Sequence, residues 1–395
     1  NYSSMWSLLQ VYEEHLKFEK QFGGLDIRTS LDYKNFRHSG DKLRIGYVSG
    51  DFKSHSVSYF FEPLLEHHNA SVVETFCYYN DTPIDGTTKR LMALSDHWRP
   101  IFSISDTDVV KLIKKDKIDI LVDLAGHTAN NRLLVFAQKP APIQVTWLGY
   151  PNTTGLSAID YRFTDEIADP VGEADNFHSE TLIRLPNGFQ CYKGNENINV
   201  NTDLPQNSRG YITFGSFNNL AKMTSQVINV WAKILKAVPN SKLVIKSSIF
   251  NTHGQHYIGL FEKEGIVADR IEFHSRVSDK NKHLEFYNKI DICLDTFCFN
   301  GATTTCEALW MGVPVITLLG DRHVGRVGAS ILTNIGLTDF IAQDIDDYVA
   351  LASKMSNRPE YLKEIRQGLR KQMLSSPLCN GQSFARDVED SYKDM

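Results

Sequence analysis

The chain has 395 residues, and its 42 Lys and Arg against 47 Asp and Glu give a net charge of −5. A hydrophobic share of 42% with 23% charged residues is ordinary for a soluble globular protein, and it excludes global disorder and fibrous architecture. The weakly acidic balance gives no electrostatic reason to expect nucleic acid or an anionic membrane as the main partner. The length predicts two or three domains.

The cysteine pattern and the hydropathy predict the compartment. Six cysteines are scattered along the chain without a Cys-x-x-Cys pair, which fits unpaired thiols in a reducing environment. No apolar run approaches the roughly 20 residues of a membrane helix, and no charged-then-apolar leader opens the chain. We therefore expect a cytoplasmic protein without a membrane partner. Because the first residue is Asn1, we also expect a further segment before it in the full protein.

The first part of the chain predicts a helix and then an α/β domain. Apolar residues recur at roughly helical spacing from Trp6 to Phe18, so residues 1–40 are interpreted as an N-terminal helical linker. A first α/β domain is predicted over residues 41–165. Its candidate elements are strands at Leu43–Ser49, Val73–Tyr79, Ile118–Asp123 and Ile143–Trp147, with a helix at Asp106–Lys114. Apolar strands alternating with helices favour a parallel sheet covered on both faces.

A second α/β series follows a region of low periodicity. Residues 166–209 are rich in Pro, Asn, Gly and Asp and are interpreted as an interdomain segment, followed by a domain over 210–375 and a C-terminal helix over 376–395. The predicted strands of this domain are Tyr211–Phe217, Lys242–Lys246, Ile271–Phe273, Ile290–Leu294 and Val313–Leu318. The predicted helices are Ser225–Val238, Gln255–Glu264, Lys282–Asn288 and Thr303–Met311. Two Rossmann-like halves facing each other across a cleft are the expected architecture.

The sharpest motif is a threonine-started helix after a buried strand. The strand ends at Leu294, and a turn through Gly301 leads to three consecutive threonines, Thr303 to Thr305. A helix N-terminus offers free backbone N–H groups to a diphosphate, and the hydroxyls add donors. An isolated threonine would more simply be a helix cap, but three after Asn-Gly at the carboxyl end of a parallel strand favour phosphate binding. One turn further, Glu307 suits ribose hydroxyls or is a solvated helix carboxylate.

A second motif is Phe214-Gly-Ser-Phe-Asn-Asn-Leu-Ala-Lys222, at the exit of the first strand of the second half. Here Asn218 and Asn219 end the strand, and Lys222 is predicted to point into the cleft. A single ammonium beside a leaving diphosphate stabilises the charge that develops there. A lone lysine is ordinarily surface charge, so only its place between a strand end and a helix start supports this role.

Histidines mark several further candidate loops. His55 follows the first strand and His127 follows the strand that ends at Asp123, while the turn Trp147–Gly155 is crowded with Gly, Pro and Asn. Each of these segments is also compatible with a structural turn. In the second half, the imidazole of His283 suits stacking on a nucleobase and the ammonium of Lys280 suits a phosphate, although the pair also fits a solvated helix start.

Other chemistries find little support. The chain has no His-Glu-x-x-His motif and no cysteine cluster for a metal, so no metal and no cofactor are expected. The P-loop ending, the dinucleotide fingerprint and the Gly-x-Ser-x-Gly nucleophile elbow are missing from the sequence.

Taken together, these segments resemble the catalytic region of the glycosyltransferase family that contains nucleocytoplasmic protein O-GlcNAc transferase and plant SPINDLY. The matching blocks run in order from about residue 43 to the end of the chain. They are Arg44-Ile-Gly-Tyr-Val-Ser-Gly-Asp-Phe52, Pro140-Ala-Pro-Ile-Gln-Val-Thr-Trp-Leu-Gly-Tyr-Pro151, Phe217-Asn-Asn-Leu-Ala-Lys222, Leu294-Asp-Thr-Phe297, Thr303-Thr-Thr-Cys-Glu-Ala-Leu-Trp-Met-Gly-Val-Pro314 and Ser375-Ser-Pro-Leu-Cys379. Several blocks at matching spacing are far more specific than any single motif.

The resemblance implies a GT-B fold and a metal-independent, inverting transfer of sugar from a nucleotide donor to Ser or Thr of an acceptor protein. By position, Lys222 matches the lysine at the donor diphosphate. His283 matches the histidine that stacks on the base. The other implied donor contacts are Asn219, Lys280, Gly301, Thr303, Thr304, Thr305, Glu307 and His127. The family usually carries tetratricopeptide repeats before this region, so repeats are expected outside this chain.

The resemblance leaves the catalytic base open. His55 matches a cleft histidine once proposed as the base, and His97 matches another. A water chain or the donor phosphate itself would serve the same purpose. His55, His97 and Lys222 are therefore the candidate catalytic residues.

Departures from the family bear on the donor. Ala302 and His127 stand where animal O-GlcNAc transferase has His and Tyr, and Gly126–Asn131 is more like SPINDLY, whose donor is GDP-fucose. Lys280 before His283 is more like the UDP-GlcNAc enzymes. We favour UDP-GlcNAc as donor. The alternatives are a protein O-fucosyltransferase using GDP-fucose, an inactive nucleotide-sugar-binding scaffold and a GT-B enzyme acting on small molecules.

Overall fold

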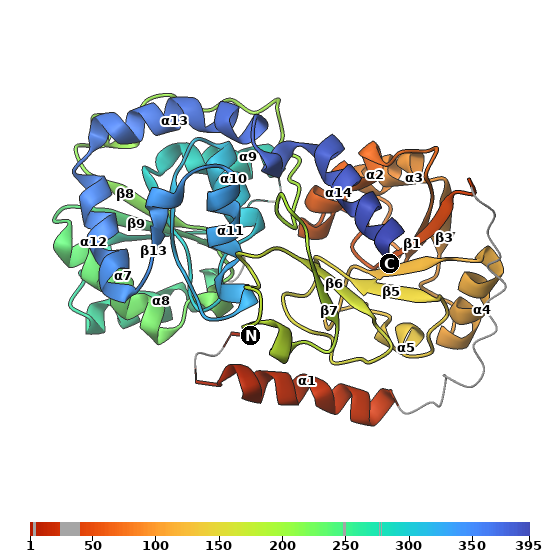
Figure 1. Ribbon diagram of the computed structural model, residues 1–395. Coiled ribbons are helices and arrows are strands. Elements are labelled where there is room, and N and C mark those ends of the chain that lie inside the picture. The colour runs from red at the N-terminus through yellow and green to blue at the C-terminus, as the bar shows by residue number, and fades with distance from the viewer. Residues whose placement is uncertain (3–4, 24–39, 248–249, 276, 278) are drawn as a thin grey trace. The chain divides into compact units, whose positions relative to one another are not determined.

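The computed structural model describes residues 1–2, 5–23, 40–247, 250–275, 277 and 279–395 (Figure 1). The chain divides into two compact units. Unit 1 comprises Asn1–Ser4 and Gly194–Leu378, and unit 2 comprises Met5–Lys193 and Cys379–Met395. Each unit is built on a parallel sheet, so the sequence correctly predicts two successive parallel α/β series.

The sheet of unit 2 has seven strands in the order β3-β2-β1-β4-β5-β6-β7. The strands are β1 (Leu43–Ser49), β2 (Val73–Tyr79), β3 (His97–Pro100), β4 (Ile120–Asp123), β5 (Ile143–Thr146), β6 (Tyr161–Thr164) and β7 (Thr181–Arg184). In register, Ser49 at the end of β1 pairs with Tyr79, and Val48 pairs with Asp123. The strand order reverses between β1 and β4, which is the topological switch point of this sheet.

Several helices of unit 2 begin at side-chain caps. They are α1 (Leu8–Phe22), α2 (Ser56–His67), α3 (Gly86–Leu94), α4 (Asp106–Asp116), the single turn α5 (Leu133–Phe136), the 3₁₀ turn η2 (Asp175–Phe177) and α14 (Gly381–Asp394). Ser7 and Gln10 form a reciprocal capping box on α1, and Ser105 accepts from Asp108 N–H at the start of α4.

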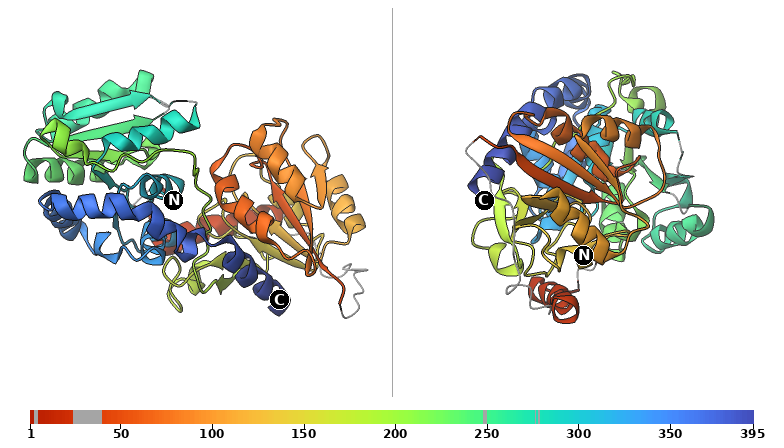
Figure 2. Two further views of the ribbon diagram at one scale, coloured as in Figure 1. Left: turned by 90° about the horizontal axis from the view of Figure 1, so that it is seen from above. Right: turned by 90° about the vertical axis from the view of Figure 1, so that its right-hand side faces the viewer.

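The last helix belongs to unit 2 although it follows unit 1 in the sequence. Figures 1 and 2 show α14, at the blue end of the colour range, beside the orange α2. Glu389 accepts hydrogen bonds from His68 Nδ1 at 2.9 Å and from Asn69 N at 2.8 Å, and the ring centroids of Phe384 and Trp147 lie 5.7 Å apart. The apolar face of α14 thereby completes the core of unit 2.

The sheet of unit 1 has six strands in the order β10-β9-β8-β11-β12-β13. The strands are β8 (Thr213–Ser216), β9 (Lys242–Ser247), β10 (Ile271–Ser275), β11 (Ile292–Leu294), β12 (Val315–Leu318) and β13 (Ile341–Ala342). Phe214 pairs with Ile292 and Gly215 with Cys293 across β8 and β11. In order of appearance this is the Rossmann arrangement 3-2-1-4-5-6, with its switch point between β8 and β11.

Helices cover the sheet of unit 1. The α-helices are α6 (Pro205–Arg209), α7 (Ser225–Ala237), α8 (Phe250–Lys263), α9 (Lys280–Glu285), α10 (Thr303–Trp310), α11 (Val327–Asn334), α12 (Ile345–Ser356) and α13 (Pro359–Leu374). The 3₁₀ turns are η3 (Leu220–Lys222), η4 (Ala268–Arg270), η5 (Phe286–Lys289), η6 (His323–Gly325), η7 (Thr338–Phe340) and η8 (Pro377–Cys379). The turn η8 crosses the unit boundary, because the second segment of unit 2 begins at Cys379. Trp231 and Tyr348, from α7 and α12, are fully buried in this core.

The compact units differ from the predicted domain division. The segment 166–209 was expected to link two domains, but Thr181–Arg184 forms the edge strand β7 of unit 2, and the boundary between units lies at Lys193 and Gly194. Residues 376–395 were expected as a separate terminal helix, whereas Cys379–Met395 belongs to unit 2. The predicted linker 1–40 forms α1 over Leu8–Phe22, and its residues 24–39 lie outside the described residues.

Candidate active site

The switch point of unit 1 gathers most of the predicted donor-binding residues. Because β8 and β11 are neighbours, the segments that follow them meet at the carboxyl edge of the sheet. The segment after β8 carries Asn218, Asn219 and Lys222, and the segment after β11 carries Gly301 and the threonines that begin α10. Hydrogen bonds connect these segments: the Nζ of Lys222 donates to Asn300 O at 2.7 Å, and the Oγ1 of Thr304 donates to Asn218 Oδ1 at 2.9 Å.

The buried carboxylate of Asp295 shapes the segment after β11. It accepts hydrogen bonds from the backbone N–H of Gly301 at 2.7 Å, from that of Thr296 at 2.9 Å and from Thr317 Oγ1 at 2.9 Å. The amide of Asn218 donates to it at 3.2 Å. Burial raises the pKa of Asp295 to about 6, although these donors and the Lys222 ammonium oppose the rise. Asp295 thus folds the segment back on the start of α10.

Lys222 carries the positive charge of this site. It ends the turn η3, which Asn219 caps by accepting from Ala221 N–H at 3.0 Å. The Nζ lies 3.9 Å from the ring centroid of Phe299. Burial lowers the pKa of Lys222 to about 8, partly offset by Asp295. The ammonium therefore lies beside the segment that leads into the threonines, in the arrangement that the sequence predicts, and Asn219 has the role of a cap that positions it.

The three threonines differ in what they contact. The residue before α10 is Ala302, which has no side-chain oxygen to cap the first turn. The buried Thr305 hydroxyl donates to Gly301 O at 3.0 Å, so it stabilises the turn. Thr304 reaches Asn218, and Thr303 begins the helix. An added Cβ at Gly301 would lie 2.4 Å from Thr304 Oγ1, so only glycine fits there.

Beside α10 lies a polar and aromatic cluster. Glu307 Oε2 is 3.0 Å from His283 Nε2 and accepts from Tyr287 Oη at 3.4 Å. The Nδ1 of His283 is 2.9 Å from the Nζ of Lys246, which comes from β9. The ring of Phe217 lies 4.4 Å from that of Tyr287. The predicted base-stacking histidine and the predicted ribose carboxylate are therefore in direct contact.

Lys280 has a different position from these residues. It is the first residue of α9 and is exposed, one helical turn before His283. Asp279 caps this helix by accepting from the N–H groups of Asn281 and Lys282 at 2.9 and 3.1 Å. Lys280 thus lies on the same short helix as the imidazole, although the sequence predicts that helix only from Lys282 onward.

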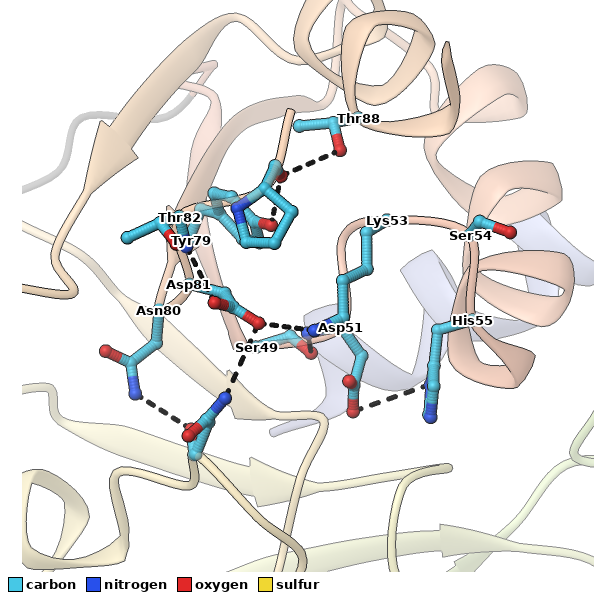
Figure 3. A network of polar contacts seen from close by, with 12 residues as sticks. Ser49, Asp51, Lys53, Ser54, His55, Tyr79, Asn80, Asp81, Thr82 and Thr88 are labelled. Carbon is cyan, nitrogen blue, oxygen red and sulfur yellow. Dashed lines mark hydrogen bonds and ion pairs between the residues drawn. The ribbon is translucent and has the colours of Figure 1, made fainter. Parts of the chain in front are cut away.

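In unit 2, the switch point is occupied by a network of charged and amide side chains (Figure 3). Lys53 forms an ion pair with Asp81. The Nδ2 of Asn80 donates to Asn130 O at 2.8 Å, which connects the segment after β2 with the segment after β4. Two acidic side chains, Asp51 and Asp81, belong to this network. Burial is the largest influence on the pKa of Asp51, which it raises.

His55 caps α2 at this edge. Its Nδ1 accepts from Val57 N–H at 3.3 Å and lies 3.5 Å from Asp51 Oδ2. A neutral imidazole whose Nδ1 accepts carries its proton on Nε2. The contact with Val57 therefore favours the Nε2–H tautomer of His55, in which that nitrogen donates a hydrogen bond.

The two other predicted histidines of unit 2 lie apart from His55. His127 Nε2 bonds to Thr154 O at 2.7 Å, and its ring centroid is 4.8 Å from that of Phe18 on α1. His97 begins the edge strand β3, where its Nε2 is 2.8 Å from Glu74 Oε1 and its ring stacks on Phe76 at 4.2 Å. The structure thus places His97 on the face of the sheet, away from the carboxyl-end loop of His55.

The described residues contain neither a metal-binding cluster nor a membrane-spanning helix. No group of three or more His, Cys, Asp and Glu side chains in that part of the chain has the spacing of a metal site. In the same residues, none of the helices combines the length and the apolar composition that crossing a bilayer requires.

Two parallel α/β units with polar loops at their switch points are the architecture of the GT-B fold. Solved glycosyltransferases share this fold: Anabaena HepE in complex with UDP and glucose aligns with a TM-score of 0.58 at 12% identity, over 89% of this chain and all of that one. The chain belongs to glycosyl transferase family 41, whose pattern it matches over residues 25–198 and 196–388. The family that the sequence motifs resemble is thereby confirmed.

Members of this family are closely similar to the chain. A lysine-to-methionine mutant of Thermobaculum terrenum O-GlcNAc transferase superposes with a TM-score of 0.91 at 32% identity, over all of this chain and 75% of that one. The barley (Hordeum vulgare) protein called "Probable UDP-N-acetylglucosamine--peptide N-acetylglucosaminyltransferase SPINDLY" is 43% identical over all of this chain. An Arabidopsis thaliana protein with the same description, but named SEC, is 34% identical over 90% of this chain. The chain spans 42% and 37% of the lengths of these two relatives.

Several residues of the site were missed by sequence reasoning. Asp295 and Asn218 lie within the sequence motifs but have no predicted role in donor binding, and Tyr287 and Lys246 belong to none of these motifs. For Lys246 a signal existed, because a lysine follows Leu-Val-Ile inside a strand that is otherwise buried. For Tyr287 there was none, since a tyrosine in a helix usually belongs to the core.

Proposed function

We propose that the chain is the catalytic part of a protein O-glycosyltransferase that transfers GlcNAc from UDP-GlcNAc to Ser or Thr of acceptor proteins, with inversion and without a metal. The observation that carries this proposal is the contact of Lys222 with Asn300, in the segment that leads into the N-terminus of α10 at the switch point of unit 1. The names of the barley and Arabidopsis relatives support UDP-GlcNAc as donor and a peptide as acceptor.

The proposed donor site has a diphosphate end and a nucleoside end. At the diphosphate end, the ammonium of Lys222, the hydroxyl groups of Thr303 and Thr304 and the backbone N–H groups of the first turn of α10 supply donors. At the nucleoside end, the carboxylate of Glu307 suits ribose hydroxyls and the ring of His283 suits a base. Lys280 supplies a further positive charge on the helix of His283.

The proposed reaction is a single displacement at the anomeric carbon. The acceptor hydroxyl oxygen forms the new C–O bond while the bond to the β-phosphate oxygen breaks, and UDP leaves with the electron pair. Lys222 stabilises the negative charge that develops on that phosphate, a role in which one preorganised donor commonly contributes 10²- to 10³-fold in rate. This assignment requires no metal.

The contacts of the histidines bear on the proton of the acceptor hydroxyl. The Nδ1 of His55 caps a helix and the Nε2 of His97 bonds to Glu74. These contacts favour water or a donor phosphate oxygen as the proton acceptor. We propose His55 as a hydrogen-bond donor toward the substrates, through its Nε2–H.

The proposal extends to the wider protein. Relatives more than twice as long support the expectation of repeats outside this chain. The six cysteines are free thiols, which supports the expected reducing cytoplasm. The domain roles remain as predicted from the sequence: the 41–165 region on the acceptor side and the 210–375 region for the nucleotide sugar.

The test is a thermal-shift titration followed by a transfer assay. A ligand at 100 times its Kd adds about 2.7 kcal/mol to the free energy of unfolding, so UDP and UDP-GlcNAc are expected to raise the Tm clearly. GDP and GDP-fucose, at the same concentrations, are expected to have little effect. Intact-mass spectrometry of an acceptor peptide should then show one added N-acetylhexosamine.

Each contrary outcome selects a named alternative. Stabilisation by GDP-fucose but not by UDP-GlcNAc, with a deoxyhexose added to the peptide, would establish the fucosyltransferase. Binding of a nucleotide sugar without transfer to any peptide or protein would establish the scaffold.

A further inference from the structure

We propose that Lys246 is a positioning residue, which holds the imidazole of His283 in its neutral Nε2–H tautomer and thereby fixes both the base-stacking ring and Glu307. The role of this contact in binding a base rests on the proposed function. Its geometry rests only on contacts within unit 1. Lys246 belongs to none of the sequence motifs that resemble the family.

Lys246 is a buried charge on a strand of the sheet. It is the fifth residue of β9, after Leu243, Val244 and Ile245, and only 2% of its surface is exposed. Its Nζ lies 2.9 Å from His283 Nδ1 and 4.3 Å from the ring centroid of Phe286. An ammonium placed against an aromatic face is stabilised by the ring quadrupole, which helps to hold the charge inside the unit.

The direction of the hydrogen bond follows from the chemistry of the two groups. An ammonium has three N–H donors and no lone pair, so it can only donate. The Nδ1 of His283 must therefore present its lone pair, and the ring proton is on Nε2. That nitrogen lies 3.0 Å from Glu307 Oε2, where a carboxylate oxygen accepts it. The three groups form one directed chain, from Lys246 through His283 to Glu307.

The other two protonation states of the ring are disfavoured in this setting. With the proton on Nδ1, an N–H group would face the ammonium, and the Nε2 lone pair would face the carboxylate. With both nitrogens protonated, two positive charges would meet about one hydrogen-bond length apart. Without the ammonium, Glu307 alone would favour the charged imidazolium.

The chain of contacts also sets the orientation of the ring. Phe217 and Tyr287 meet the imidazole edge to face, with centroids at 6.1 and 6.0 Å and interplanar angles of 61° and 88°. Tyr287 also donates to Glu307 at 3.4 Å. A neutral ring held at both nitrogens and on its sides presents a fixed surface to a stacking base, and preorganisation of this kind improves affinity by reducing the entropic cost of binding.

The experiment reads the ring nitrogens directly. Protein labelled with ¹⁵N-histidine gives separate signals for protonated and unprotonated ring nitrogens, and His283→Gln assigns the signal of interest. The wild type should show His283 with a protonated Nε2 and an unprotonated Nδ1 at pH 7.5. Lys246→Met should shift this signal toward the doubly protonated ring. Lys242→Met, on the same strand but beside Glu272 and Tyr211, should leave it unchanged.

Binding of UDP by calorimetry completes the test. The loss of one buried, charged hydrogen bond in the supporting chain should weaken UDP about tenfold in Lys246→Met and not at all in Lys242→Met. A wild-type His283 protonated on Nδ1 overturns the proposal whether or not the variant folds, and so does an unchanged signal and affinity in Lys246→Met. The predicted tautomer in a protein that binds no nucleotide would confirm the positioning chain and overturn the proposed function instead.

Discussion

The two units share the strand order of their first six strands, but the charged side chains at their switch points are arranged differently. In unit 1, one ammonium, a helix N-terminus without a side-chain cap and hydroxyl groups meet around the buried Asp295. In unit 2, the equivalent edge holds Lys53 paired with Asp81, and Asp51 beside His55. The charge of Lys53 is thus matched by a carboxylate, while Lys222 bonds to a backbone carbonyl.

This difference shows what topology provides and what it leaves to the side chains. The reversal of strand order brings two loops together in each sheet, whatever their sequence. Whether the resulting edge binds a diphosphate depends on its net charge and on free N–H groups. From this comparison we expect that removing the Lys222 ammonium lowers the transfer activity strongly, and that substitutions at the edge of unit 2 lower it less.

The largest effect is expected for Lys222→Met. The variant should lose about 10²- to 10³-fold in kcat, because the charge that develops on the leaving phosphate is no longer stabilised. Steady-state transfer assays measure the loss, and thermal unfolding verifies the fold. Lys233→Met, an exposed position on α7, is the matched control, and Lys53→Met in unit 2 should cost less than tenfold. Equal losses in Lys222→Met and Lys53→Met would break the comparison.

The second effect concerns pH. Lys222 has a lowered pKa of about 8, so its ammonium is present below that pH and is lost as the pH rises through it. The affinity for UDP should therefore weaken above pH 8, by up to about tenfold per pH unit when only the charged form binds. Calorimetry between pH 7 and 9.5 measures this. Lys222→Met should bind more weakly, with little change over the same range; a slope that survives in this variant would assign the titration to another group.

A smaller effect should separate two adjacent threonines. Thr304→Val removes a hydroxyl proposed to contact the donor and should weaken UDP several-fold. Its loss in the free energy of unfolding should be smaller than that of Thr305→Val, because the bond to Asn218 that it removes is only partly buried. Thr305→Val removes the buried hydrogen bond to Gly301 O, which should cost about 1 to 2 kcal/mol in the free energy of unfolding. Calorimetry and denaturant unfolding measure the two quantities. The reverse pattern would exchange the roles assigned to these residues.

The smallest effect is expected for His97→Phe. The ring contact with Phe76 is retained while the partly exposed hydrogen bond to Glu74 is lost, so stability should fall by about 0.5 to 1 kcal/mol. Turnover should stay at the wild-type value. His55→Phe, which removes the proposed donor at the unit 2 edge, should lower turnover measurably. A large loss of kcat in His97→Phe with an unchanged melting curve would reinstate it as a catalytic residue.

Much of the fold follows from the pattern of apolar strands. Leu43–Ser49 and Val73–Tyr79 have the predicted bounds, and α4 begins at the predicted Asp106. The missed strands β3, β6, β7 and β13 have four residues or fewer and include or adjoin edge strands, where half-exposed side chains give little periodicity. The packing of α14 on unit 2 depends on contacts between residues far apart in the sequence, so the local sequence pattern does not predict it.

The site was predictable where it lies on loops after strands. The parallel order places the residues around Lys222 and Thr303 at one edge, so their convergence could be deduced from the strands alone. The role of Asp295 could not be predicted from the sequence. It depends on hydrogen bonds that its carboxylate accepts from Thr317 and Gly301, which are brought to it only by the folded chain. The position of His97 was likewise hidden, since nothing in the sequence showed that its strand would place it against Glu74.

The place of α14 has a consequence for the synthesis of the protein. Unit 2 is assembled from two stretches of chain that are separated by nearly all of unit 1. On the ribosome, Tyr47 and His68 are made long before their partners Tyr392 and Glu389. The first sheet must therefore wait, with the surface of α2 uncovered, until the final helix emerges. Unit 1 is the part that can complete its own core first, and chaperones that bind apolar surface would act on the part of unit 2 that is translated before unit 1.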